Sequence, residues 1–144
     1  MVCSVSPSGR LSTPAVPSNI TILSIEVFAA SRGNMLPNPL HDPVNAICYA
    51  VEAQEGPTDC TTNERGFLMI KMDDMDPSTL EGVGMCVDSG GVLVTFAADE
   101  HDLLQSLEAL IRRWDPDFLV GFEVQKASIG YLIDRASQID VSCA

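Results

Sequence analysis

Short runs of apolar and β-branched residues occupy the first half of the chain and predict β-strands. The first run is Thr21–Phe28, the second is Val44–Val51 and the third is Gly66–Met72, and each has the residue types of a strand. The stretches between them, Arg32–Pro43 and Gln54–Glu64, are polar or rich in proline and glycine, which predicts loops. Three strands joined by loops without helices predict an antiparallel meander.

The second half of the chain alternates between strand and helix patterns. We expect a strand at Val92–Ala97, a helix at Asp99–Trp114 with Asp99 as its N-cap, a buried strand at Phe118–Phe122 and a final helix at Lys126–Gln138. The two strands are expected to run parallel, because a helix crossover joins them. The first helix carries an apolar stripe at helical spacing, formed by Leu103, Leu104, Leu107, Leu110, Ile111 and Trp114. The expected inward positions of the final helix are Ile129, Leu132, Ile133 and Ala136.

The order strand–strand–strand, strand–helix–strand–helix indicates the α/β class. It is also the order of a ribonuclease-H-like fold, in which an antiparallel meander continues into a β-α-β-α half. A chain of 144 residues suits one domain with its own core. We expect a flexible, Ser/Pro-rich lead-in over residues 1–18 and one domain over residues 19–144, incomplete at its C-terminus. Residues 73–91 are acidic and rich in turn residues.

The charge of the chain restricts its partners. A formal net charge of −12, with only eight lysines and arginines, argues against unaided nucleic-acid binding, because phosphate contacts draw on such residues. A basic partner protein or basic neighbouring domains fit better. No apolar run approaches the roughly 20 residues that span a bilayer, and residues 1–17 lack the apolar core of a secretory signal. The five cysteines have no C-x-x-C spacing, so we expect reduced thiols, with Cys48 and Cys86 buried.

The segment from Asp115 to Ala136 carries the most specific pattern of the chain. It resembles the second motif, G-[YF]-N-x-x-N-F-D-x-x-Y-L, of the proofreading 3′→5′ exonuclease domain of family B DNA polymerases. With L-S-I-E on the first strand and T-F-A-A-D-E before the first helix, it is similar to the zeta-type translesion polymerases of that family over about residues 19–143. The motif scaffold corresponds to Gly121, Phe122, Glu123, Gln125 and Tyr131.

Three positions of this resemblance bear on metal chemistry. In the family, a D-x-E triplet on the first strand and an aspartate seven residues after the motif glycine hold magnesium. Two-metal sites, with the ions about 4 Å apart, are built from clustered carboxylates. Here these positions are Ser24, Glu26 and Ser128, and the third motif, Y-x-x-x-D, has no counterpart before Ala144. One acidic ligand of the expected four is present, so we expect no catalytic and no metal-binding residue.

The resemblance implies a catalytically inactive exonuclease-like domain with a structural role. The parent would be a zeta-type DNA-directed DNA polymerase that acts in translesion synthesis, DNA repair and DNA replication in the nucleus. The implied partners are the remaining domains and accessory subunits of that polymerase, with DNA bound only in the context of the full polymerase and with no membrane. Magnesium and an iron–sulfur cluster are implied for the parent and not for this chain. Enzymatic activity stays open, because the polymerase aspartates and most nuclease ligands are missing from the sequence.

Two other functions also stay open. The first is an active metal-dependent 3′→5′ exonuclease that uses Glu26, Glu123 and Asp134 as substitute ligands. The second is a stand-alone acidic interaction protein that has reused the fold.

Structural roles are the simpler interpretation for several of these residues. Glu26 is expected to be a hydrogen-bond acceptor in the former cleft, because a partnerless buried carboxylate is costly. Ser24 and Ser128 either face each other across that cleft or act as small fillers. His41 and His101 are expected at the surface, since neither lies near a nucleophile pattern.

Overall fold

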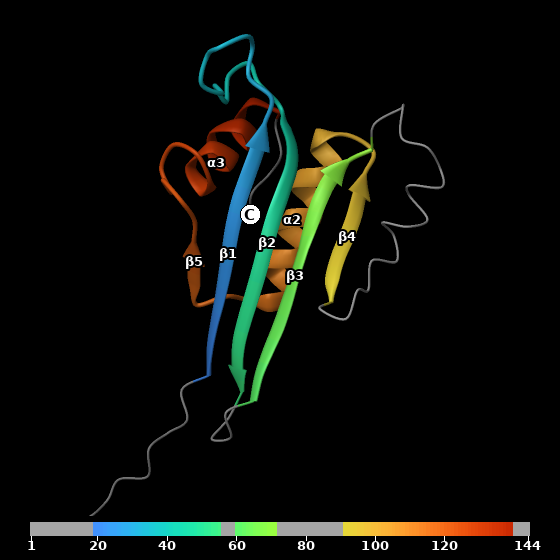
Figure 1. Cartoon of the computed structure of the whole chain (residues 1–144), viewed down its shortest axis with the longest axis vertical. Helices are drawn as coiled ribbons and strands as arrows, with labels where there is room; N and C mark the ends of the chain where they lie inside the picture. Colours follow the sequence, from blue (N-terminus) through green and yellow to red (C-terminus); the bar gives the residue numbers. More distant parts are fainter. Residues whose placement is uncertain (1–18, 56–59, 72–90, 140–144) are drawn as a thin grey trace, which may run out of the picture.

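A computed structural model describes residues 19–55, 60–71 and 91–139 (Figure 1). They form a mixed five-stranded sheet with two helices, which confirms the α/β class. The elements are β1 (Ile20–Ala29), β2 (Val44–Glu55), β3 (Cys60–Ile70), β4 (Val92–Ala97), α2 (Glu100–Trp114), β5 (Phe118–Val120) and α3 (Ile129–Gln138). The predicted lead-in at 1–18, Cys86 and all but the last residue of the acidic segment 73–91 lie outside the described residues.

The strand order in the sheet is β4-β3-β2-β1-β5. The pairs β1–β2 and β2–β3 are antiparallel, which confirms the predicted meander. The strand β4 runs parallel to β3, and β5 runs parallel to β1. The strands on either side of α2 therefore share one direction, as predicted, but they occupy opposite edges of the sheet with three strands between them.

The hairpin between β2 and β3 is longer than predicted. The range Gln54–Glu64 was expected to be a loop, but β2 continues to Glu55 and β3 begins at Cys60. The ladder holds through this region, with Gln54 opposite Thr61 and Glu55 opposite Cys60. Polar residues extend the strands because backbone groups form the ladder and need no apolar side chains for it. Polarity does not mark the end of a strand here.

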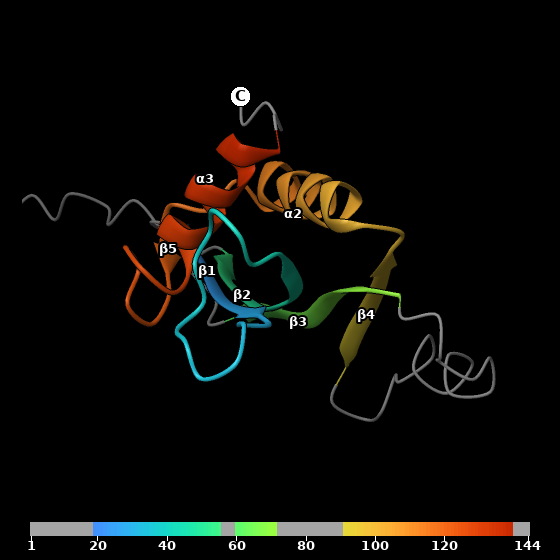
Figure 2. The same cartoon turned by 90° about the horizontal axis from the view of Figure 1, so that it is seen from above.

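Both helices lie on one face of the sheet and leave the other face bare of described helices (Figure 2). The core lies between the helices and the sheet, and it contains Leu23, Ile25, Ile47, Val51, Leu103 and Leu107. The helix α2 has the predicted stripe and N-cap, since Asp99 accepts a hydrogen bond from the Asp102 N–H at 2.9 Å. In the described part of the chain, neither helix is long and apolar enough to cross a membrane.

The strand β5 is shorter and more exposed than predicted. It was expected to be buried over Phe118–Phe122, but it spans three residues, and Phe118 is 57% exposed. The cause is its place at the sheet edge, where β1 is its only partner among the described strands.

The final helix also differs from its prediction. It begins at Ile129, because a turn occupies residues 122–127. Ile133 was expected to point inward but is 60% exposed, and Tyr131 takes a core position instead. The buried stripe of α3 is Tyr131, Leu132 and Ala136, so the helix is rotated relative to the predicted orientation.

Two side-chain expectations have different outcomes. His41 and His101 are exposed, as predicted. Cys48 was expected to be buried but is only partly so, because it lies on the bare face of the sheet. Its partial burial, with the nearby Glu26 charge, raises the pKa of the Cys48 thiol.

Candidate degenerate exonuclease site

The strand β1 presents Ser24 and Glu26 to the bare face of the sheet. Successive side chains of a strand point to opposite faces, and Leu23 and Ile25 are buried beneath the helices. Ser24 is half-buried and Glu26 is exposed. Both line a shallow hollow of about 290 Å³ together with Cys48 and Phe67. The two positions of the D-x-E triplet therefore lie on one face, as strand geometry requires.

Glu26 binds the backbone of the segment that follows β5. Its Oε1 accepts a hydrogen bond from the Phe122 N–H at 2.8 Å, a contact between residues 96 apart in the chain. Glu26 is thus a hydrogen-bond acceptor, as expected, but it is exposed, whereas the expectation rested on a buried carboxylate. Hydrogen bonds to a charged carboxylate are stronger than those between neutral groups, so Glu26 holds β1 against the start of this segment.

Ser128 is packed against Gly121, which follows β5 directly. A Cβ at position 121 would contact Ser128 Oγ and would lie 2.8 Å from the Ile25 carbonyl oxygen, so only glycine fits there. Ser128 is fully buried at the N-cap position of α3, but its side chain makes no capping bond. Its Oγ has no hydrogen-bond partner among the described residues. No hydrogen bond joins Ser128 to Ser24 in the described part of the chain, and whether the two face each other across the former cleft stays a prediction.

A tight turn joins Gly121 to α3. Glu123 has a φ of 45°, which is uncommon outside glycine, and its carbonyl accepts from the Lys126 N–H at 2.8 Å. Gly130 donates to the Val124 carbonyl at 2.6 Å and packs so closely on Gln125 that a Cβ would overlap its backbone. Four of the scaffold positions thus belong to this turn or directly precede it: Gly121, Phe122, Glu123 and Gln125.

The fifth scaffold residue, Tyr131, connects α3 to the loop before β2. Its hydroxyl donates to the Asp42 carbonyl oxygen at 2.6 Å. Burial, with the Asp42 charge nearby, raises the pKa of Tyr131. The Asp42 carboxylate is also buried and accepts from the Asn38 N–H and from Arg32 Nε, each at 2.9 Å. The Asn38 hydrogen bond is the main cause that lowers the pKa of Asp42, and the Arg32 charge adds to it against desolvation.

A partly buried ion pair between α2 and α3 was missed by sequence reasoning. Arg135 donates to both carboxylate oxygens of Glu100 at 2.8 Å and to the Pro39 carbonyl at 3.0 Å. Glu100 also accepts from the Val44 N–H at 2.7 Å. The hydrogen bond to Glu100 raises the pKa of Arg135. The available signal was an acidic residue in the first turn of one helix and a basic residue in the last turn of the next.

The proposed substitute ligands do not converge. Glu123 and Asp134 line a cleft of about 560 Å³ with Lys126 and Tyr131, on the side of β1 that Val27 and Ala29 face. Glu26 points to the opposite face of the same strand. Among the described residues, no group of three His, Cys, Asp or Glu side chains is placed to hold a metal ion. The residues present therefore do not fit the magnesium pair that the family resemblance implies.

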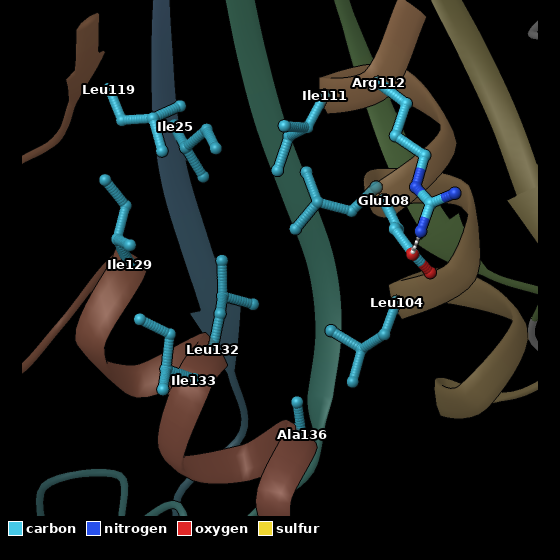
Figure 3. Close-up of a pocket in the computed structure, with 11 residues that line it drawn as sticks. Ile25, Leu104, Glu108, Ile111, Arg112, Leu119, Ile129, Leu132, Ile133 and Ala136 are labelled. Carbon is cyan, nitrogen blue, oxygen red and sulfur yellow. Dashed lines mark ion pairs between the residues drawn. The ribbon is translucent and has the colours of Figure 1, made fainter. Parts of the chain in front are cut away.

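The apolar groove between α2 and α3 offers no reactive group either (Figure 3). It has a volume of about 240 Å³ and is lined by residues such as Ile25, Leu104 and Leu132. Its charged members are Glu108 and Arg112, which form an ion pair at 2.6 Å. This groove is a packing feature between the helices and holds no candidate ligand.

The comparisons with known proteins agree with this architecture. The family described as DNA polymerase family B, exonuclease domain, matches residues 3–143. The chain therefore belongs to the exonuclease-domain family of family B DNA polymerases. Within that class it is similar to the DNA polymerase zeta catalytic subunits of Mus musculus (34% identity over 128 residues, 85% of this chain) and Saccharomyces cerevisiae (27% over 135 residues, 94%).

A more distant similarity links the chain to the DNA polymerase delta catalytic subunit of Bos taurus, at 27% identity over 124 residues. The chain spans 4% of the length of the mouse relative, 9% of the yeast relative and 10% of the bovine relative. These matches confirm the resemblance to zeta-type polymerases that the motifs indicated.

Proposed function

We propose that this chain is a catalytically inactive, ribonuclease-H-like exonuclease module of a zeta-type translesion DNA polymerase. The observation that carries the proposal is the state of the three motif positions. Ser128 is fully buried against Gly121, Ser24 is neutral, and Glu26 is engaged with the Phe122 N–H. A single carboxylate at these positions gives a magnesium ion too few anionic oxygens for the usual site.

The function of such a module is architectural. The net charge of −12 and the apolar side chains on the bare face of the sheet suit contacts with other parts of a polymerase better than unaided contact with DNA. We place its partners among the remaining polymerase domains and accessory subunits, in the nucleus, with DNA engaged only by the full polymerase. The parent's magnesium and iron–sulfur cluster belong to its other domains. The absence of proofreading suits lesion bypass, because excision opposite a lesion would undo the insertion.

A nuclease assay tests the proposal directly. The 144-residue chain is incubated with a labelled single-stranded oligonucleotide while magnesium or manganese is titrated. We expect no metal-dependent shortening of the strand above the level of a buffer blank. Glu26→Gln and Glu52→Gln are prepared in parallel, because Glu52 is also an exposed carboxylate of the bare face but lies on β2 and is none of the three motif positions. Digestion that Glu26→Gln abolishes and Glu52→Gln preserves would establish an active nuclease and overturn the proposal.

A further inference from the structure

We infer that residues 72–90, which connect β3 to β4, cross the bare face of the sheet on the side away from both helices and make the margin of that face negative. The order and direction of the described strands carry this inference. It goes beyond the proposed function and does not depend on it.

Two connections of the chain join parallel strands of this sheet. The first runs from β3 to its neighbour β4, and the second runs from β4 through α2 to β5 at the opposite edge. The strands β3, β4 and β5 share one direction, because β1 and β3 are both antiparallel to β2. Along the strand order, the first connection therefore moves away from β5 and the second moves towards it.

The handedness of such connections fixes the side on which each one passes. Connections between parallel strands of one sheet are right-handed in about 98% of cases. The second connection obeys this rule, because the chain rises in β4 at the right of Figure 1, passes behind the sheet in α2 and rises again in β5 at the left. A right-handed connection that moves in the opposite direction passes on the opposite side of the sheet. The connection from β3 to β4 therefore crosses the bare face.

The burial of β4 agrees with a neighbour on that side. Val92 lines the hollow of the bare face, so Val94 and Phe96 face that side too. All three are half-buried, whereas Leu93 and Thr95 on the helix side are exposed. With the bare side of this edge strand open to water we would expect the reverse, because the described helices lie over the other side (Figure 2).

The connection has the length and the residue types to cross this face. The strand β4 spans about 20 Å, whereas residues 72–90 reach roughly 60 Å when extended. They contain apolar residues that can pack on Val94 and Phe96, including three methionines. They also contain five acidic residues and no lysine or arginine. The chain therefore brings five negative charges to the β4 margin of the bare face.

This charge restricts what the rest of the bare face can bind. Phe67 is 40% exposed and is paired across the ladder with Cys48. Glu26 and Glu52 already lie on this face, with Arg65 as the described cation that lines the hollows. Five further acidic residues at the margin make the potential over the exposed apolar side chains negative. Such a surface fits a partner segment with apolar and basic side chains and disfavours a phosphate backbone.

Cross-linking from the two sides of β4 tests the path of the connection. Val94→Cys and Thr95→Cys are adjacent positions that face opposite sides, and each is made in the 144-residue chain with Cys86 as its only other cysteine. The cysteines changed to serine are Cys3, Cys48, Cys60 and Cys143. Cross-linking to Cys86 by a short bismaleimide is followed by mass spectrometry, and each rate is divided by that of the same thiol with N-ethylmaleimide.

We expect the corrected rate to be roughly tenfold higher for Val94→Cys than for Thr95→Cys, because only the bare side gives Cys86 a high effective concentration. Equal corrected rates, or a higher rate for Thr95→Cys, would overturn the inference.

The charge at the margin is tested at the native Cys48, in a chain whose other cysteines are serine. The rates of a cationic and an anionic methanethiosulfonate are compared before and after the five acidic residues of 72–90 are changed to their amides. At a salt concentration of about 0.1 M, where screening acts over about 10 Å, we expect the advantage of the cationic reagent to fall about twofold or more. The matched control is Arg112→Cys with Cys48→Ser, because Arg112 is 62% exposed on α2, on the other side of the sheet.

The ratio at this control position should stay unchanged. No change at Cys48, or an equal change at both positions, would overturn the inference. Neither rate depends on digestion of DNA, so a failure here and a failure of the proposed function are separate outcomes.

Discussion

Replacing Arg135 with methionine removes the ion pair that ties α3 to α2 and to the loop before β2. The Arg135 and Glu100 side chains are only 13% and 14% exposed, and Arg135 makes three hydrogen bonds within 3.0 Å. Methionine keeps much of the aliphatic stem but leaves the Pro39 carbonyl and one side of the Glu100 carboxylate without a donor. We therefore expect a large loss of stability from a single substitution.

The magnitude follows from burial. Breaking a buried ion pair by removing one partner costs about 3–5 kcal/mol. Glu100 retains the Val44 N–H as a donor, so the loss for Arg135→Met should lie at the lower end, about 3 kcal/mol. Glu100→Gln retains an acceptor for Val44 and should cost about 1–2 kcal/mol. The double variant should lose less than the sum of the two, because both substitutions remove the same pair.

Urea denaturation followed by circular dichroism measures these losses. With a slope of about 2 kcal/mol per molar urea, a loss of 3 kcal/mol moves the midpoint by roughly 1.5 M. Arg112→Met is the matched control, since Arg112 is 62% exposed and pairs with Glu108 on the surface of α2. Surface pairs one helical turn apart contribute about 0.5 kcal/mol or less. Equal midpoint shifts for Arg135→Met and Arg112→Met, or strict additivity in the double variant, would refute the reasoning.

Three further predictions concern titration and association. The Asn38 N–H holds the pKa of Asp42 below 3.8, so Asp42 contributes stability at neutral pH that is lost as the pH falls through this lowered pKa. The urea midpoint of Asp42→Asn should therefore vary less with pH than that of the parent chain between about pH 5 and pH 3. Burial and the Glu64 charge raise the pKa of Tyr49 to about 12, so its stabilising effect is full below pH 10 and is lost as the pH rises towards 12. Tyrosinate absorbance should show this displaced titration, and Glu64→Gln should lower the pKa of Tyr49. Phe67 is 40% exposed on the bare face. The isolated chain should therefore bind an apolar dye and self-associate in sedimentation, and Phe67→Ser should weaken both effects. A monomer that binds no dye would contradict the prediction.

The spacing of apolar residues predicted correctly the helices and strands that are determined by residues close to them in the sequence. The helix α2 has the predicted apolar stripe, N-cap and end, because Asp99, the leucine spacing and Pro116 all act within a few residues of the helix. The strand β4 was predicted over its exact bounds for the same reason. The β2–β3 hairpin was predicted too short, since a ladder can continue through exposed polar residues that carry no apolar signal.

Features set by distant parts of the chain were not visible in the sequence. The exposure of Phe118 depends on which edge of the sheet β5 joins, and the exposure of Ile133 depends on the rotation of α3. At the candidate site, the residue types at positions 24, 26 and 128 were readable from the motif. The Glu26–Phe122 bond joins residues 96 apart, and the burial of Ser128 follows from its contact with Gly121. No periodic pattern encodes such contacts.

The place of β1 between β2 and β5 has a consequence for synthesis on the ribosome. Its antiparallel partner β2 follows within a few tens of residues, whereas its parallel partner β5 begins at Phe118, about 90 residues after β1 ends. At translation rates of about 5–20 residues per second, one side of β1 remains unpaired for roughly 5–20 s. During that interval the nascent three-stranded meander presents an open edge beside Leu23 and Ile25. Such an edge can pair with another chain, so delays in the emergence of β5 should favour misassembly.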